Sequence, residues 1–150
     1  MKRAACLISF LFVALTLLPT TAAAPHTLKA KGAHGWAKFW ARGSGSVRVS
    51  GKGSLTIENA SNLQIKMDGT WGEMKKLPDG FKYTHFEGSA ECIGIGAHIE
   101  MRGWNLELSA KGNGKAHFQG EGTAQVDDGP EEPWPGDMTH QKWLKVHYGD

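Results

Sequence analysis

The sequence contains little that could form a disulfide framework or a thiolate metal site. Among its 150 residues only Cys6 and Cys92 are cysteines, and Cys6 lies in the apolar N-terminal stretch. If that stretch is removed on export, Cys92 is left alone and cannot form an internal disulfide. We expect Cys92 to be a buried, unreactive thiol, with an intermolecular disulfide as the alternative.

The sequence also lacks an apolar run long enough to span a membrane. Residues 4–18 are almost entirely apolar, follow Lys2 and Arg3, and precede the small residues at 20–24. Since a spanning helix needs about 20 apolar residues, this shorter run predicts a signal peptide at residues 1–24. We expect export to the periplasm, the cell surface or the medium, and no transmembrane span after cleavage. An uncleaved N-terminal anchor is the alternative.

An excess of charge of either sign is missing as well. The chain has 17 lysines and arginines against 15 aspartates and glutamates. Loss of Lys2 and Arg3 with the signal peptide would leave equal numbers of basic and acidic residues. Because binding to a phosphate backbone depends on a basic surface, we expect no nucleic acid among the partners.

Recognisable catalytic and metal-binding patterns are absent. The seven histidines show no ligand-like spacing with an acid or a cysteine, although His98 and His117 could meet in the fold. Glu91, Glu100 and Glu107 are expected to point outward from strands, and paired carboxylates hydrolyse glycosides only where a cleft holds them. We therefore predict no catalytic residues, no metal site and no cofactor, with a small hydrolase as the alternative.

What the sequence does have is glycine, 20 residues of it, within strict alternation. From Gly35 to Ile57 every odd position is glycine or apolar, and from Leu106 to Val126 every even position is. A period of two is typical of strands with one buried and one solvated face. Residues 25–126 are therefore predicted to form one all-β domain.

Pairs of glycines interrupt the alternation and allow two local structures. The triplet at 51–53 could form a hairpin loop with Val49 opposite Leu55. Alternatively, the strand could continue through it and use inward glycines to bend at a corner. We predict an antiparallel meander of short strands that closes as a barrel or sandwich, with a β-solenoid or roll as the alternative.

The C-terminal tail has a different composition. Residues 127–137 hold five acidic residues and three prolines without apolar periodicity, which predicts an extended linker. In residues 138–150, Leu144, Val146 and Tyr148 alternate as in a strand, so we expect this segment to dock onto the domain.

Three glycine-punctuated units, at 45–53, 88–96 and 114–122, share the pattern Gly-x-apolar-x-apolar-x-Gly-x-Gly. In this respect the chain resembles a loose group of secreted, glycine-punctuated β proteins of bacteria and archaea whose function is unknown. The resemblance covers residues 35–126 and implies no particular activity.

Two tryptophans break the polar face of the first alternating block. Trp36 and Trp40 share this face with Lys38 and Arg42, and along a strand the two indoles lie about 13 Å apart. Because exposed aromatics stack on sugar rings or contact proteins, we take these four residues as the candidate ligand-binding site. The alternative is that another part of the chain covers the stripe through one of three further tryptophans: Trp71, Trp134 or Trp143.

Together these features predict an exported, non-enzymatic structural or surface-associated β protein. Its partner would be another copy of the chain or another component of the cell envelope. The alternative is a monomeric binding module that holds a carbohydrate or small ligand on the tryptophan stripe.

Overall fold

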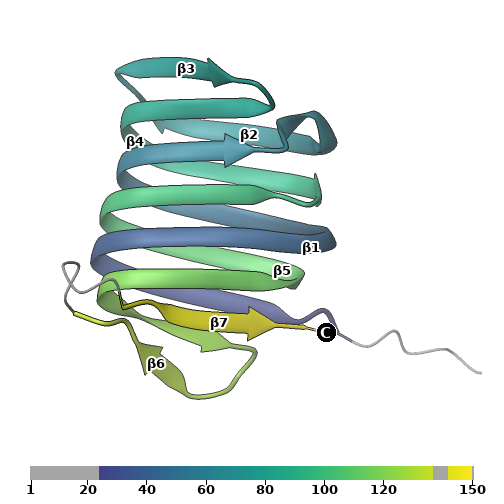
Figure 1. Cartoon of the computed structure of the whole chain (residues 1–150), viewed down its shortest axis with the longest axis vertical. Coiled ribbons are helices and arrows are strands. Elements are labelled where there is room, and N and C mark those ends of the chain that lie inside the picture. The colour runs from purple at the N-terminus through teal and green to yellow at the C-terminus, as the bar shows by residue number, and fades with distance from the viewer. Residues whose placement is uncertain (1–23, 137–141, 150) are drawn as a thin grey trace, which may run out of the picture.

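The computed structural model describes residues 24–136 and 142–149, and this part of the protein is all-β (Figure 1). The strands are β1 (Thr27–Glu58), β2 (Leu63–Thr70), β3 (Glu73–Leu77), β4 (Gly80–Ile95), β5 (His98–Val126), β6 (Glu131–Pro133) and β7 (Leu144–Tyr148). A short 3-10 turn, η1 (Ala60–Asn62), joins β1 to β2. The all-β prediction is confirmed. The predicted signal peptide lies outside the described residues except for its last position.

The seven strands form one antiparallel sheet, but not the predicted meander. Their order is β2-β4-β1-β5-β6, with β3 also on β4 and β7 also on β5, and the sheet is not closed. A meander would pair strands in chain order, whereas here β1 lies between β4 and β5. The physical reason is strand length: β1 has 32 residues and β5 has 29, so each strand passes the other more than once.

The strands β1 and β5 pair repeatedly because both wind around the molecule. Leu28 of β1 pairs with both Ala110 and Val126 of β5. Ala110 pairs in turn with Val47, which is nineteen residues further along β1. Figure 1 shows the long strands curving from the front of the molecule round to its back. The sheet is therefore a coil in which one strand occupies several successive turns.

The whole coil is one long β-hairpin. Leu77 of β3 lies opposite Gly80 of β4, so the two strands are joined by the two-residue turn Pro78-Asp79. The first arm of the hairpin contains β1, β2 and β3, and the second arm contains β4 and β5. Each arm pairs with the other on both sides, because neighbouring turns of the coil are also hydrogen-bonded. We call the β2–β3 end of the coil the hairpin end, and the β6–β7 end the tail end.

Paired glycines lie where the strands bend. Gly53 pairs with Gly103, so β1 continues through its Gly-x-Gly triplet. Val49 and Leu55 are therefore not partners, and the hairpin-loop interpretation of the triplet is wrong. A Cβ atom on Gly103 would lie 1.8 Å from the carbonyl oxygen of Lys52. The two backbones approach so closely at this corner that only glycine fits.

Apolar side chains fill the inside of the coil. The buried residues come from the inward positions of the long strands and include Phe39, Leu55 and Phe118. The interior cavity near the tail end measures about 10 Å³, which is at the lower limit of what one water molecule needs. Cys92 is fully buried, as predicted, and this burial, with the charge of Glu91, raises the pKa of its thiol to about 12.

The segment predicted to be a linker takes part in the fold. Within residues 127–137, β6 pairs with residues 123–125 of β5. Trp134 follows β6 and is buried against Phe118, with the two rings stacked and their centroids 5.0 Å apart. The sequence pattern did not predict this burial, because Trp134 is a single apolar residue and does not belong to a periodic run.

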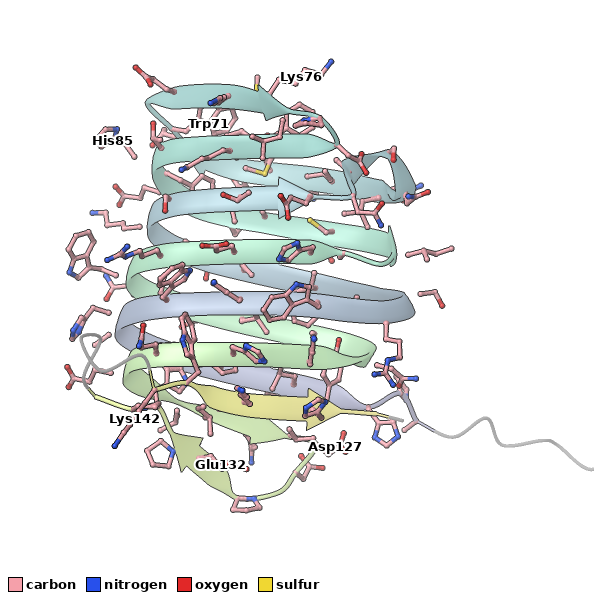
Figure 2. The ribbon with its side chains drawn as sticks, in the orientation of Figure 1. Trp71, Lys76, His85, Asp127, Glu132 and Lys142 are labelled. Atoms are coloured by element: carbon pink, nitrogen blue, oxygen red, sulfur yellow. The ribbon has the colours of Figure 1, made fainter. Side chains whose placement is uncertain are left out.

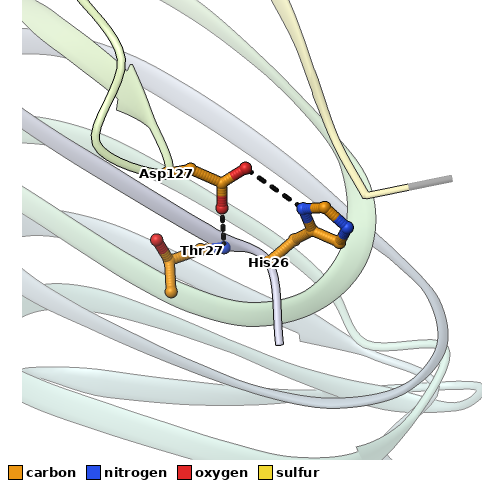
Figure 3. Close-up of polar contacts among 3 residues, drawn as sticks. All are labelled: His26, Thr27 and Asp127. Carbon is orange, nitrogen blue, oxygen red and sulfur yellow. Dashed lines mark hydrogen bonds and ion pairs between the residues drawn. The ribbon is translucent and has the colours of Figure 1, made fainter. Parts of the chain in front are cut away.

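The last described residues add a further strand. β7 pairs with residues 114–118 of β5 and buries Val146 and Tyr148. Asp127 fastens the start of the tail to the start of β1 (Figure 3). Its Oδ1 accepts a hydrogen bond from the backbone N–H of Thr27 at 2.9 Å, and its Oδ2 lies 3.1 Å from Nδ1 of His26. The Thr27 bond, then the His26 contact, lowers the pKa of Asp127.

No helix among residues 24–136 and 142–149 is long and apolar enough to cross a membrane.

Candidate functional site

The predicted tryptophan stripe lies on one outer face of the coil, where other strands add side chains to it. Positions 36–42 of β1 lie between residues 98–102 and residues 113–119, both of which belong to β5. Beyond these, β7 and the residue before it extend the same surface. We call this surface the tryptophan face and define it by Trp36, Lys38, Trp40, Arg102, Lys115, Trp143 and Lys145.

Trp36 is half-buried and its ring is held by several neighbours. Its Nε1 donates a hydrogen bond to Oε1 of Glu100 at 2.7 Å. Nζ of Lys38 lies 4.4 Å from the ring centroid, and Cζ of Arg102 lies 5.1 Å from it. Trp143, from the tail, packs edge-on against Trp36 with the centroids 5.1 Å apart. The tail therefore covers part of the stripe, as the alternative interpretation of the sequence supposed.

Trp40 lies between two histidines. It stacks on His98 with the centroids 5.1 Å apart, and it makes an edge contact with His117 at 4.9 Å. Nζ of Lys115 lies 5.2 Å from the Trp40 centroid. His98 and His117 thus come together around an indole, and no group of three metal-ligating side chains occurs among the described residues. Nδ1 of His98 is also paired with Glu58 at 2.5 Å.

The cations of the tryptophan face form no ion pairs with other described residues. None of the ion pairs in the described part of the chain involves Lys38, Arg102, Lys115 or Lys145. Partial burial, together with the nearby charges of Lys145, Lys115, His147 and Lys38, lowers the pKa of His117. This face is therefore locally positive, although the predicted mature chain is close to neutral.

The remaining residues singled out in the sequence lie apart from this cluster. Arg42 is exposed at the far end of the stripe, opposite Asn113. Glu100 is hydrogen-bonded on the tryptophan face, whereas Glu91 and Glu107 occupy the opposite face of the coil, separated by the strand that carries Arg48. The three carboxylates are thus not gathered into a pair or a cleft.

A second candidate site, which the sequence did not reveal, lies at a corner of the coil. A surface hollow of about 540 Å³ is lined by side chains from β1, β4 and β5. We call it the corner groove and define it by His34, Ser54, Thr84, His85, Arg102 and Trp104. Trp104 is 64% exposed. No ring contact or cation–π contact involves Trp104 among the described residues.

The groove arises where three strands change the phase of their alternation. The buried positions switch from even to odd numbers in β1, and from odd to even numbers in β4 and β5. The change falls between Ala30 and Ala37 in β1, between Tyr83 and Phe86 in β4, and between Met101 and Leu106 in β5. Each change requires an irregularity of the β-bulge kind, which re-aims side chains.

The backbone confirms that these positions are irregular. His85 and Asn105 have φ angles of 51° and 52°, a left-handed conformation that non-glycine residues adopt rarely. Trp104 pairs with both His34 and Lys52, so the irregular positions lie in neighbouring strands across the corner. Figure 2 shows His85 standing out from this edge of the molecule. Each phase change is visible in the sequence, but their alignment is not, because it depends on the register of distant strands.

Comparison of the chain with protein-family models, with curated proteins and with solved structures gave no match.

Proposed function

We propose that the protein is an exported, non-enzymatic binding protein that holds an anionic polymer on its tryptophan face. The main support is a group of four cations that surround three indoles and form no ion pair in the described part of the chain: Lys38, Arg102, Lys115 and Lys145. Three of these cations already lie over an indole ring, so little side-chain freedom is lost when an anion binds them.

A neutral sugar fits the tryptophan face less well than an anion does. Stacking of a sugar ring needs an open indole face. On Trp36 the ring lies against Lys38, Arg102 and Trp143, and on Trp40 it lies against His98. Among the described residues these cations form no ion pair, so their charges are not already neutralised. Charge, and not ring stacking, is therefore the feature that this face offers.

Assembly through sheet edges, the first hypothesis from the sequence, has less support. At the tail end β6 and β7 cover the edge of β5. At the hairpin end the edge strands bear Lys66, Lys75 and Lys76, and lysine on an edge strand opposes pairing with another strand. We further infer that the coil is the roll or solenoid alternative, because its strands repeat along one axis and do not form two separate sheets.

The test measures binding of dextran sulfate to the chain from Pro25 onward by isothermal titration calorimetry. The double variant Lys38→Ala/Lys115→Ala should bind about tenfold more weakly than the parent, since two anion contacts are lost. The matched control is Lys29→Ala/Lys66→Ala, which removes the same charge from the opposite face of the coil. We expect the control to bind like the parent.

Salt provides a second readout. Affinity for the parent should fall steeply between about 50 and 200 mM salt, because binding releases counterions, and the slope should be smaller for the tryptophan-face variant. Equal weakening in both double variants would mean that the polymer responds only to net charge. That result would refute the proposal, and so would a parent that binds neither dextran sulfate nor a second polyanion, inorganic polyphosphate.

A further inference from the structure

We propose that the corner groove is a saccharide-stacking subsite, so that the anionic polymer held on the tryptophan face is a glycan. This inference depends on the proposed function, because it identifies the chemical class of that polymer. It assigns a second set of residues, centred on Trp104, to the same ligand.

Trp104 has the open ring that the tryptophan face lacks. It is 64% exposed, whereas Trp36 and Trp40 are half-buried under cations and other rings. A large aromatic side chain left in solvent next to a hollow usually marks an interaction site. A pyranose ring has one apolar C–H face that fits such an indole, and it has hydroxyl groups around its rim.

The other side chains of the groove match those hydroxyl groups. Ser54 and Thr84 supply hydroxyls that donate and accept, and His34 and His85 supply ring nitrogens. Arg102 adds guanidinium donors that suit a hydroxyl, a carboxylate or a sulfate. The hollow of about 540 Å³ is open to solvent and falls within the range of small-ligand sites.

Two backbone positions at the groove have an unfavourable conformation. His85, which lines the groove, and Asn105, which follows Trp104, occupy the left-handed region without being glycine, and such conformations are unfavourable. They persist where the surrounding structure holds them, and they are common at ligand sites. In this molecule His85 and Trp104 both line the hollow, and the two left-handed positions are His85 itself and the residue after Trp104.

Arg102 joins the groove to the tryptophan face. It lines the groove, and its Cζ lies 5.1 Å from the ring centroid of Trp36. Trp104 pairs with His34, six residues before Trp40 on β1, so the two surfaces extend over roughly 20 Å of one strand. An extended polymer can therefore place a ring on Trp104 and its acidic groups on the cations beyond it.

The test compares two polyanions, dextran sulfate, which has sugar rings, and inorganic polyphosphate, which has none. The variant is Trp104→Ala, and the matched control is Ile95→Ala, which removes another exposed apolar side chain from outside the groove. Trp104→Ala should weaken binding of dextran sulfate about tenfold and leave binding of polyphosphate unchanged. Ile95→Ala should change neither affinity. Unfolding midpoints equal to that of the parent will show that both variants are folded.

Several outcomes would overturn the inference. One is that Trp104→Ala leaves both affinities unchanged, or lowers both equally. Another is that the parent binds polyphosphate but not dextran sulfate. In these cases weakening by Lys38→Ala/Lys115→Ala would still support the anion-binding function alone. If the parent binds neither polymer, the proposed function fails and the subsite fails with it.

Discussion

The two ends of the coil differ in how far they are covered by other parts of the chain. At the tail end Trp134, Val146 and Tyr148 are each at most 5% exposed, and β6 and β7 pair with the last turn. At the hairpin end no strand covers β2 and β3 in the described part of the chain, and Met74 is 52% exposed although it lies opposite the buried Tyr83. Figure 1 shows the tail strands below the coil and β3 alone at its top.

The difference shows two ways in which the end of a coil can be protected from pairing with another strand. One end is closed by the chain itself, and the other has charge on its edge. Lys76 lies opposite Phe81, which puts it on the inner side of the sheet, yet it is exposed. Figure 2 shows Lys76 pointing away at the top of the molecule. An inward-facing charge on an edge strand opposes the addition of a further strand.

The prediction with the largest expected effect compares one tryptophan from each end of the coil. Trp134→Ala should lower the free energy of unfolding by about 3–5 kcal/mol, because it empties a buried site beside Phe118. Trp71→Ala, at the hairpin end, should cost about 1 kcal/mol or less, since Trp71 is 43% exposed. Urea unfolding followed by circular dichroism measures both. Equal losses in the free energy of unfolding would contradict the difference in burial between the two ends.

A second prediction removes the charge that protects the hairpin end. Lys76→Ile should cause self-association that increases with protein concentration, because the edge strand β3 then offers an apolar inner side to a second copy. Size-exclusion chromatography with light scattering measures the molar mass. Lys66→Ile, on the outward side of β2, is the control and should associate less. If Lys76→Ile stays monomeric at every concentration, this charge does not protect the end.

The smallest effect concerns the fastening of the tail. Asp127→Asn should lower the Tm at pH 7 by about 2 °C, since the exposed carboxylate loses its charge-assisted contacts with Thr27 and His26. The folded-state pKa of Asp127 lies below its ordinary value of 3.8, so its stabilising effect is present above that pH and is lost as pH falls through the folded pKa. The difference in Tm between variant and parent should therefore shrink below pH 3.8. If the difference in Tm stayed constant as the pH fell, the loss of stability would come from the altered side chain and not from its lost charge.

Alternation was sufficient to predict much of the local structure. It indicated all-β strands, the inward positions such as Phe39 and Leu55, and the burial of Cys92. These features depend on neighbours within a few residues, so the sequence states them directly.

The coil itself could not be predicted in this way. A Gly-x-Gly triplet preserves the alternation whether the strand folds back or continues, so the pattern cannot distinguish a meander from a coil. The pairing of Leu28 with both Ala110 and Val126 follows from the register of strands far apart in the chain. For the same reason the sequence could single out Trp36 as a candidate ligand-binding residue but could not predict its contacts with Arg102 and Trp143.

The double winding of the hairpin also restricts how such a molecule can change in length. Between two successive turns of β1, such as those at Leu28 and Val47, lies a turn of β5. An insertion of one turn in the first arm would therefore leave a gap unless the second arm gained a turn at the matching place. A tandem duplication of one gene segment cannot supply both. Within the coil, length can therefore change only through paired insertions of equal size in the two arms, whereas at the Pro78-Asp79 turn one contiguous insertion could lengthen both arms together.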